Sequence, residues 1–171
     1  MAVTRVHIYN QIINLFWTAV CFAPLVRLWY LHYVPAILIS TLAVCLLPIF
    51  IPGKHFGAMQ LSRRRKFYES LLIKSFQSFT QDGRLVSALT NKRNKHYRLV
   101  RQRATHGAYK TQIAMYEKFH WSCLVFFLVS FAYAIYQQAF LVSFLILISN
   151  VVYNVIPILI QQYNKLRLGL A

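Results

Sequence analysis

Acidic residues are nearly absent from this chain. Its 171 residues include three Asp and Glu, against 19 Lys and Arg, and the formal net charge is +16. The three acids, Glu69, Asp82 and Glu117, are far apart in the sequence, so it has no paired-carboxylate motif. It has neither a CxxC pair nor a histidine cluster, so nothing in it signals a metal site. Gly-rich phosphate loops, the GxSxG motif of hydrolases and internal repeats are absent as well.

Charged residues of both signs are scarce, at 13% of the chain, whereas 58% of its residues are hydrophobic. A water-soluble domain of this size needs more polar surface. Four long apolar runs are each close to the roughly 20 residues of a membrane-spanning helix, and they cover residues 8–26, 34–51, 121–136 and 140–160. We therefore expect an all-α integral membrane protein with about four transmembrane helices. The alternative has three spans, with one N-terminal segment lying in the interface.

Two features refine this expectation. The last two runs are separated only by Gln137 and Gln138, which predicts a helical hairpin. The first run follows Arg5 as a signal peptide would, but it is long and a second apolar run comes directly after it. We expect it to be retained. Cys21, Cys45 and Cys123 all lie in predicted spans and are interpreted as small apolar residues.

The distribution of cations predicts the orientation. Of the 19 Lys and Arg residues, 15 lie in residues 53–118, and Arg27 is the only one near an expected outer turn. Cations near membrane-spanning segments stay on the cytoplasmic side. We expect a multi-pass protein of the cytoplasmic membrane with both termini inside. Its three parts are an N-terminal transmembrane pair (residues 1–52), a basic cytoplasmic loop (53–118), and a C-terminal hairpin with a short basic tail (119–171).

The basic loop begins with a predicted amphipathic helix over residues 61–79. Apolar side chains recur on one side at helical spacing, and the segment starts with Arg63-Arg64-Arg65-Lys66. Such a helix suits the membrane surface, where its apolar side enters the interface and its cations meet anionic headgroups. The alternative is that these cations hold the phosphates of an acyl-CoA or of a lipid headgroup.

The second basic run, residues 91–103, contains six cations. Only Tyr97 there could stack on a base, and the run is tethered between membrane spans, so we expect no nucleic-acid partner. A solvated loop near anionic lipid is the favoured interpretation.

Glu117 and His120 form the one acid–base pair that invites a chemical interpretation. They are three residues apart on a predicted helix, so they share a face. They would lie at the cytoplasmic membrane boundary, where a histidine can remove a proton from a hydroxyl nucleophile and a carboxylate can orient it. The alternative is that both are interfacial residues and that Glu117 pairs with a neighbouring Lys or Arg.

Three blocks, in this order, resemble the glycosyl-4,4'-diaponeurosporenoate acyltransferase family of small bacterial membrane enzymes. The first is Lys66-Phe67-Tyr68-Glu69, continuing through Ile73-Lys74 and Phe76 to Asp82-Gly83, and the second is Glu117-Lys118-Phe119-His120-Trp121. The third has Asn154 and Pro157 followed by Gln161-Gln162-Tyr163-Asn164-Lys165-Leu166-Arg167-Leu168. The resemblance covers roughly residues 56–168. Among the departures, Gln162 and Lys165 each stand where the family has Arg, Phe76 replaces a Trp and Gln81 a Pro, and residues 112–115 lack the family's Glu-Thr-x-Arg.

The resemblance implies transfer of a fatty-acyl group from a thioester donor, an acyl-CoA or an acyl-carrier thioester, to a hydroxyl of a glycolipid or carotenoid glycoside at the inner leaflet. No bound cofactor or metal is expected. His120 is the expected general base and Glu117 its orienting partner. The expected substrate-binding residues are Asn154, Lys66, Lys74, Arg167 and Trp121. For Asn154 a helix-packing contact is an equal alternative.

A non-catalytic function stays open beside this one. A small membrane subunit or scaffold would use the basic loop to bind a partner protein or anionic lipid, and the chain could be part of a homo-oligomer. An enzyme should gather Glu117, His120 and Asn154 around one site, whereas a scaffold should disperse them or satisfy them by local pairs.

Overall fold

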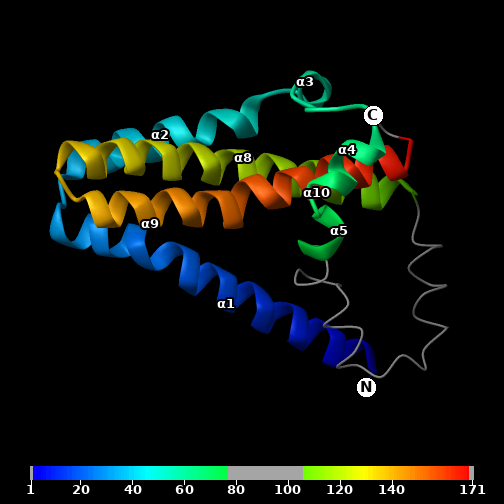
Figure 1. Cartoon of the computed structure of the whole chain (residues 1–171), viewed down its shortest axis with the longest axis horizontal. Helices are drawn as coiled ribbons and strands as arrows, with labels where there is room; N and C mark the ends of the chain where they lie inside the picture. Colours follow the sequence, from blue (N-terminus) through cyan, green and yellow to red (C-terminus); the bar gives the residue numbers. More distant parts are fainter. Residues whose placement is uncertain (1, 77–105, 170–171) are drawn as a thin grey trace.

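The part of the chain that the structure describes forms four antiparallel helical rods, and short helices follow the second rod. The computed structural model describes residues 2–76 and 106–169, and within these residues every regular element is helical, which confirms the all-α class. The rods are α1 (Ala2–Leu31), α2 (Pro35–Phe50), α8 (His106–Tyr136) and a last rod made of α9 (Phe140–Asn150), the π-helical η2 (Val151–Val155) and α10 (Ile156–Arg167). The short helices α3 (Gly53–Ala58), α4 (Arg65–Ser70) and α5 (Ile73–Phe76) follow α2 (Figure 1).

Three of the rods are long and apolar enough to cross a membrane. They supply the segments His7–Leu31, Thr111–Tyr136 and Phe140–Arg167. The fourth rod, α2, has 16 residues, or about 24 Å at 1.5 Å per residue, less than the roughly 30 Å of a hydrocarbon core. Of the four expected spans, three therefore have the length of a span, and the second is a shorter apolar helix packed along α8 (Figure 1).

The turns between the rods follow from local chemistry. Pro35 opens α2, where its missing N–H is tolerated and its fixed φ suits the first helical turn. Between α8 and α9, Gln138 adopts a left-handed φ of 58° and reverses the chain. The predicted hairpin around Gln137 and Gln138 is confirmed, because α8 ends at Tyr136 and α9 begins at Phe140.

One apolar core joins α1, α8 and α9 toward the end of the bundle where these turns lie. Its buried members are Leu25, Leu28, Trp29, Phe127, Tyr133, Ala134 and Ile146. Trp29 stacks on Tyr133 and donates from Nε1 to Ser130 Oγ at 3.2 Å. Tyr30 and Tyr33, near Arg27, are exposed, whereas Trp29 is a core residue.

The predicted single amphipathic helix over residues 61–79 is wrong as far as the structure describes it. Two short helices, α4 and α5, replace it, and Leu72 between them has a left-handed φ of 56°. This break lets both Tyr68 and Ile73 pack on Leu159, Ile160 and Tyr163 of α10. Phe79, Asp82-Gly83 and the basic run 91–103 lie outside the described residues.

Both described chain ends lie at one end of the bundle. The start of α1, the helices α3 to α5 and the end of α10 are found there, and the short turns between rods lie at the other end (Figure 1). This is the arrangement that the cation distribution predicts. The side of a membrane that this end would face remains a prediction.

Phe127 is the test of the core, because it is fully buried and its ring contacts Phe22 and Tyr153. We expect Phe127→Ala to lower the free energy of unfolding by about 3–5 kcal/mol, as loss of a buried aromatic ring does. Thermal unfolding in detergent measures this. The adjacent Leu128→Ala is the control, since Leu128 is 43% exposed. Equal destabilisation by the two variants would contradict the packing described.

Candidate functional site

A buried ion pair joins α8 to α10. Lys165 Nζ donates to both carboxylate oxygens of Glu117, at 3.0 Å and 2.8 Å. The Glu117 side chain is 2% exposed and that of Lys165 13%. An ion pair this far from water depends on its geometry, because either charge alone would be strongly disfavoured. The pair therefore fixes α10 against α8.

The depth of this pair can be estimated from helix lengths. A hydrocarbon core is spanned by about 20 helical residues. Counted back from Gln137, such a span reaches Glu117 in α8, and counted forward from Phe140 it reaches Ile160 in α10. Glu117 and Lys165 thus lie at the edge of the apolar part of both helices.

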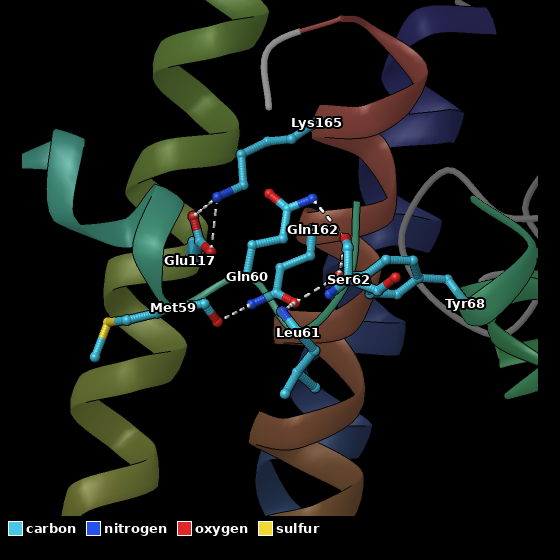
Figure 2. A network of polar contacts seen from close by, with 8 residues as sticks. All are labelled: Met59, Gln60, Leu61, Ser62, Tyr68, Glu117, Gln162 and Lys165. Atoms are coloured by element: carbon cyan, nitrogen blue, oxygen red, sulfur yellow. Dashed lines mark hydrogen bonds and ion pairs between the residues drawn. The ribbon is translucent and has the colours of Figure 1, made fainter. Parts of the chain in front are cut away.

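Gln162, one turn before Lys165, holds the segment that links α3 to α4. Its Oε1 accepts from the Leu61 N–H at 3.2 Å, and its Nε2 donates to the Met59 carbonyl at 3.1 Å (Figure 2). The Tyr68 hydroxyl lies 3.0 Å from Gln162 Oε1 and accepts from the Ser62 N–H at 3.1 Å. Gln162 is 1% exposed and Tyr68 0%. These bonds give the backbone of residues 59–62 partners that it lacks in an irregular segment.

Further polar contacts fasten α4 to the end of α10. The Tyr163 hydroxyl donates to Glu69 Oε1 at 3.0 Å, and Lys74 pairs with the same oxygen at 2.8 Å. Lys74 and Tyr163 together lower the pKa of the Glu69 carboxyl. Arg65 Nη2 donates to the Leu166 carbonyl at 3.0 Å, where a cation complements a helix C-terminus. Burial raises the pKa of the Tyr68 phenol.

His120 lies next to the π-helical turn of the last rod. Its ring packs edge-on against Tyr153, with centroids 5.8 Å apart, and Asn154 lies against the same imidazole. The Ile156 N–H bonds to the Val151 carbonyl, five residues back. Pro157 has no N–H to give to the Tyr153 carbonyl four residues before it. Such π turns are frequent at functional sites.

Two buried polar atoms at this point are unsatisfied. Within the described residues, His120 Nδ1 and Asn154 Oδ1 have no hydrogen-bond partner. Asn154 is fully buried and donates from Nδ2 to Asn150 Oδ1 at 2.8 Å. The expected helix-packing contact of Asn154 is thus present on its donor side, and the rest of its amide lies beside the His120 imidazole. An unsatisfied buried polar group is worth about 1–3 kcal/mol to a ligand that pairs with it.

The structure brings the three family-like blocks together. The first block, on α4 and α5, packs on the third, on α10, and the second, on α8, joins the third through Glu117 and Lys165. His120 and Asn154 are neighbours, whereas Glu117 is bonded to Lys165 and not to His120. Trp121 is half-buried with its Nε1 unpaired in the described part of the chain.

Three residues are expected to bind phosphate or a lipid headgroup. Lys66 lies on α4, Lys74 on α5 and Arg167 at the end of α10. Lys66 is exposed, Lys74 is paired with Glu69, and the Arg167 guanidinium lies 5.8 Å from the Tyr163 ring. No three His, Cys, Asp or Glu side chains gather as metal ligands would among residues 2–76 and 106–169.

Sequence reasoning missed several residues of this site. Gln162 and Lys165 were singled out only as departures from a family pattern, and both are central to the network. Tyr153 gave no signal, although its hydroxyl bonds to Thr18 of α1 at 2.9 Å and its ring contacts His120. Polar residues spaced three or four apart in the last apolar run, Asn150 and Asn154, were the available clue.

Comparison with known proteins identifies a family. The family model described as glycosyl-4,4'-diaponeurosporenoate acyltransferase matches residues 52–171. No curated protein and no solved structure matches the chain significantly. The matched region includes α3, α4, α5, α8 and the last rod, but neither α1 nor α2.

The ion pair yields a stability prediction. Glu117→Leu or Lys165→Met alone should lower the free energy of unfolding by about 3–5 kcal/mol, because each leaves a buried charge unpaired. The double variant should recover most of this loss, which a double-mutant cycle in detergent would measure. The exposed Glu69–Lys74 pair is the control, and its disruption should change stability by less than about 1 kcal/mol. Additive effects of the Glu117 and Lys165 substitutions would rule out the coupling.

The role of Gln162 is tested by comparing it with its neighbour. Gln162→Leu removes all partners of Met59 and Leu61 on α10, so the amides of Leu61 and Ser62 should exchange with deuterium faster. Losing buried hydrogen bonds worth about 1–3 kcal/mol should accelerate exchange by about tenfold or more. Gln161→Leu should leave these rates unchanged. Unaltered exchange in Gln162→Leu would mean that other contacts hold the segment.

Proposed function

The chain belongs to the glycosyl-4,4'-diaponeurosporenoate acyltransferase family, and from this premise we propose that it transfers a fatty-acyl group from a thioester to a hydroxyl of a membrane glycolipid. The observation that carries the proposal is the pair of unsatisfied buried atoms, His120 Nδ1 and Asn154 Oδ1, at neighbouring positions of two facing helices. One is a base and the other a hydrogen-bond acceptor. Each can accept a hydrogen bond from a different hydroxyl of a sugar.

In the proposed reaction, His120 removes the proton from the acceptor hydroxyl as its oxygen attacks the thioester carbonyl. The new C–O bond forms and the C–S bond breaks, and the thiolate leaves with the proton that His120 has taken up. Asn154 Oδ1 holds the acceptor by accepting a hydrogen bond from a second hydroxyl of the sugar, because the reacting hydroxyl has one proton and gives it to His120. An acyl-CoA or acyl-carrier thioester supplies the acyl group and a glycolipid or carotenoid glycoside receives it.

The bonds of Glu117 change its proposed role. Both of its carboxylate oxygens are engaged by Lys165, so we assign it to positioning: it holds α10, and hence the π turn that carries Asn154, against α8. Trp121, Lys66, Lys74 and Arg167 are proposed to contact the substrates. The cations suit phosphate or headgroup oxygens.

A non-catalytic membrane subunit is the second candidate. The observation in its favour is that Glu117 is satisfied by a local pair, as a purely structural residue would be. In that case His120 Nδ1 and Asn154 Oδ1 would not take part in a reaction. The two candidates differ in one measurable respect, which is whether cellular lipids depend on the protein.

The experiment is lipid mass spectrometry of cells with and without the protein. We expect an acylated glycolipid to disappear on deletion and to return with the unsubstituted chain. His120→Ala should lower its formation by about a hundredfold or more, the usual contribution of a general base. Asn154→Leu should lower it by about tenfold to a hundredfold, the value of a buried hydrogen bond.

His55→Ala is the matched control, because His55 is an exposed histidine of α3. It should support full product formation. An unchanged lipid profile on deletion would refute acyl transfer and favour the subunit. Product formation by His120→Ala at the unsubstituted level would instead refute the assignment of the base.

A further inference from the structure

The α4–α5 segment, residues 63–76, carries an apolar surface that the proposed acyl transfer does not use, although its cations Lys66 and Lys74 are also proposed to contact the substrates. Its side toward the bundle is accounted for, since Tyr68 and Ile73 are buried against α10. Its other side chains include the large apolar groups Phe67, Leu71, Leu72 and Phe76, which are 38%, 41%, 63% and 43% exposed. Phe67 on α4, Phe76 on α5, and Leu71 and Leu72 between these helices thus expose apolar surface that the described residues do not cover.

Cations accompany these apolar groups. Arg63, Arg64 and Lys66 are exposed, and they immediately precede or begin the same segment. The described residues contain two carboxylates, Glu69 and Glu117, and these are bonded to Lys74 and Lys165. The three cations therefore have no carboxylate partner among the residues that the structure describes.

The position of the segment favours a membrane surface as the partner. It packs on α10 around Tyr163, just beyond Ile160, where a span of about 20 residues counted from Phe140 ends. This is headgroup depth. The break at Leu72 keeps both α4 and α5 packed on α10. One continuous helix would instead extend away from α10.

We propose that the α4–α5 segment is a docking element for anionic phospholipid of the adjacent leaflet. Phe67, Leu71, Leu72 and Phe76 enter the interface, and Arg63, Arg64 and Lys66 contact the phosphates. An acidic protein or a soluble nucleotide would satisfy the cations but would leave four apolar side chains without a partner. The combination of apolar groups and cations is that of interfacial helices.

Docking also has a consequence inside the protein. The segment is tied to α10 by the bonds of Tyr68 to Gln162 and of Tyr163 to Glu69. Lipid bound on its outer side therefore stabilises the contact of residues 59–62 with α10. This effect is independent of whether the protein transfers an acyl group.

The test uses the full-length chain in uncharged detergent micelles, with its three cysteines replaced by alanine and Ser75→Cys labelled with a polarity-sensitive dye. Ser75 is exposed in α5. Phosphatidylglycerol should shift the dye emission to shorter wavelength, and phosphatidylcholine should not. The triple variant R63Q/R64Q/K66Q should bind phosphatidylglycerol about a hundredfold more weakly, since each cation contributes about fivefold.

Arg27→Gln is the matched control, because it removes an exposed cation at the opposite end of the bundle and should leave the titration unchanged. High salt should weaken the response of the unsubstituted chain, which tests the charges without any substitution in the segment. An equal response to both lipids, a triple variant that binds like the parent, or displacement of phosphatidylglycerol by coenzyme A would each overturn the proposal.

Discussion

The Glu117–Lys165 ion pair determines how the functional end of the bundle is arranged. In apolar surroundings a lone carboxylate or ammonium is strongly disfavoured, so the two helices that carry these groups have one rotational setting in which both are satisfied. With Lys165 turned toward α8, Gln162 lies on the same face one turn earlier. It meets residues 59–62 there. The position of α4 follows, because Tyr68 bonds to Gln162 and Arg65 to the last carbonyls of α10.

The π-helical turn changes which side of the last rod faces its neighbours. An extra residue in a turn rotates everything after it by about 100° relative to a regular helix. In α9 the buried face carries Ser143, Ile146 and Asn150, whereas in α10 it carries Gln162, Tyr163 and Lys165. The turn also places Asn154 beside His120. The same irregularity therefore positions the proposed acceptor site and redirects α10 toward α4.

Much of this fold is visible in the sequence, because long apolar runs and the Gln137-Gln138 turn are local features. The partner of Glu117 cannot be recognised from the sequence. Spacing suggested His120, three residues away, but the carboxylate pairs with Lys165, 48 residues further along on another helix. The break at Leu72 is equally hidden, since a helical pattern over residues 61–79 does not reveal that Tyr68 and Ile73 must both reach α10. Contacts between helices decide these points, and periodicity carries no information about them.

Gln162 and Lys165 of α10 differ in how well an arginine could take their place. Lys165 stands where the family pattern has Arg, and it retains the charge that Glu117 requires. Gln162 also stands at an Arg position, but an arginine has five donors and no acceptor. It could donate to the Met59 carbonyl but could not accept from the Leu61 N–H or the Tyr68 hydroxyl, as Gln162 Oε1 does. A chain with Arg at this position must hold the segment before α4 differently. The hold of α10 on residues 59–62 therefore depends on the acceptor oxygen of Gln162.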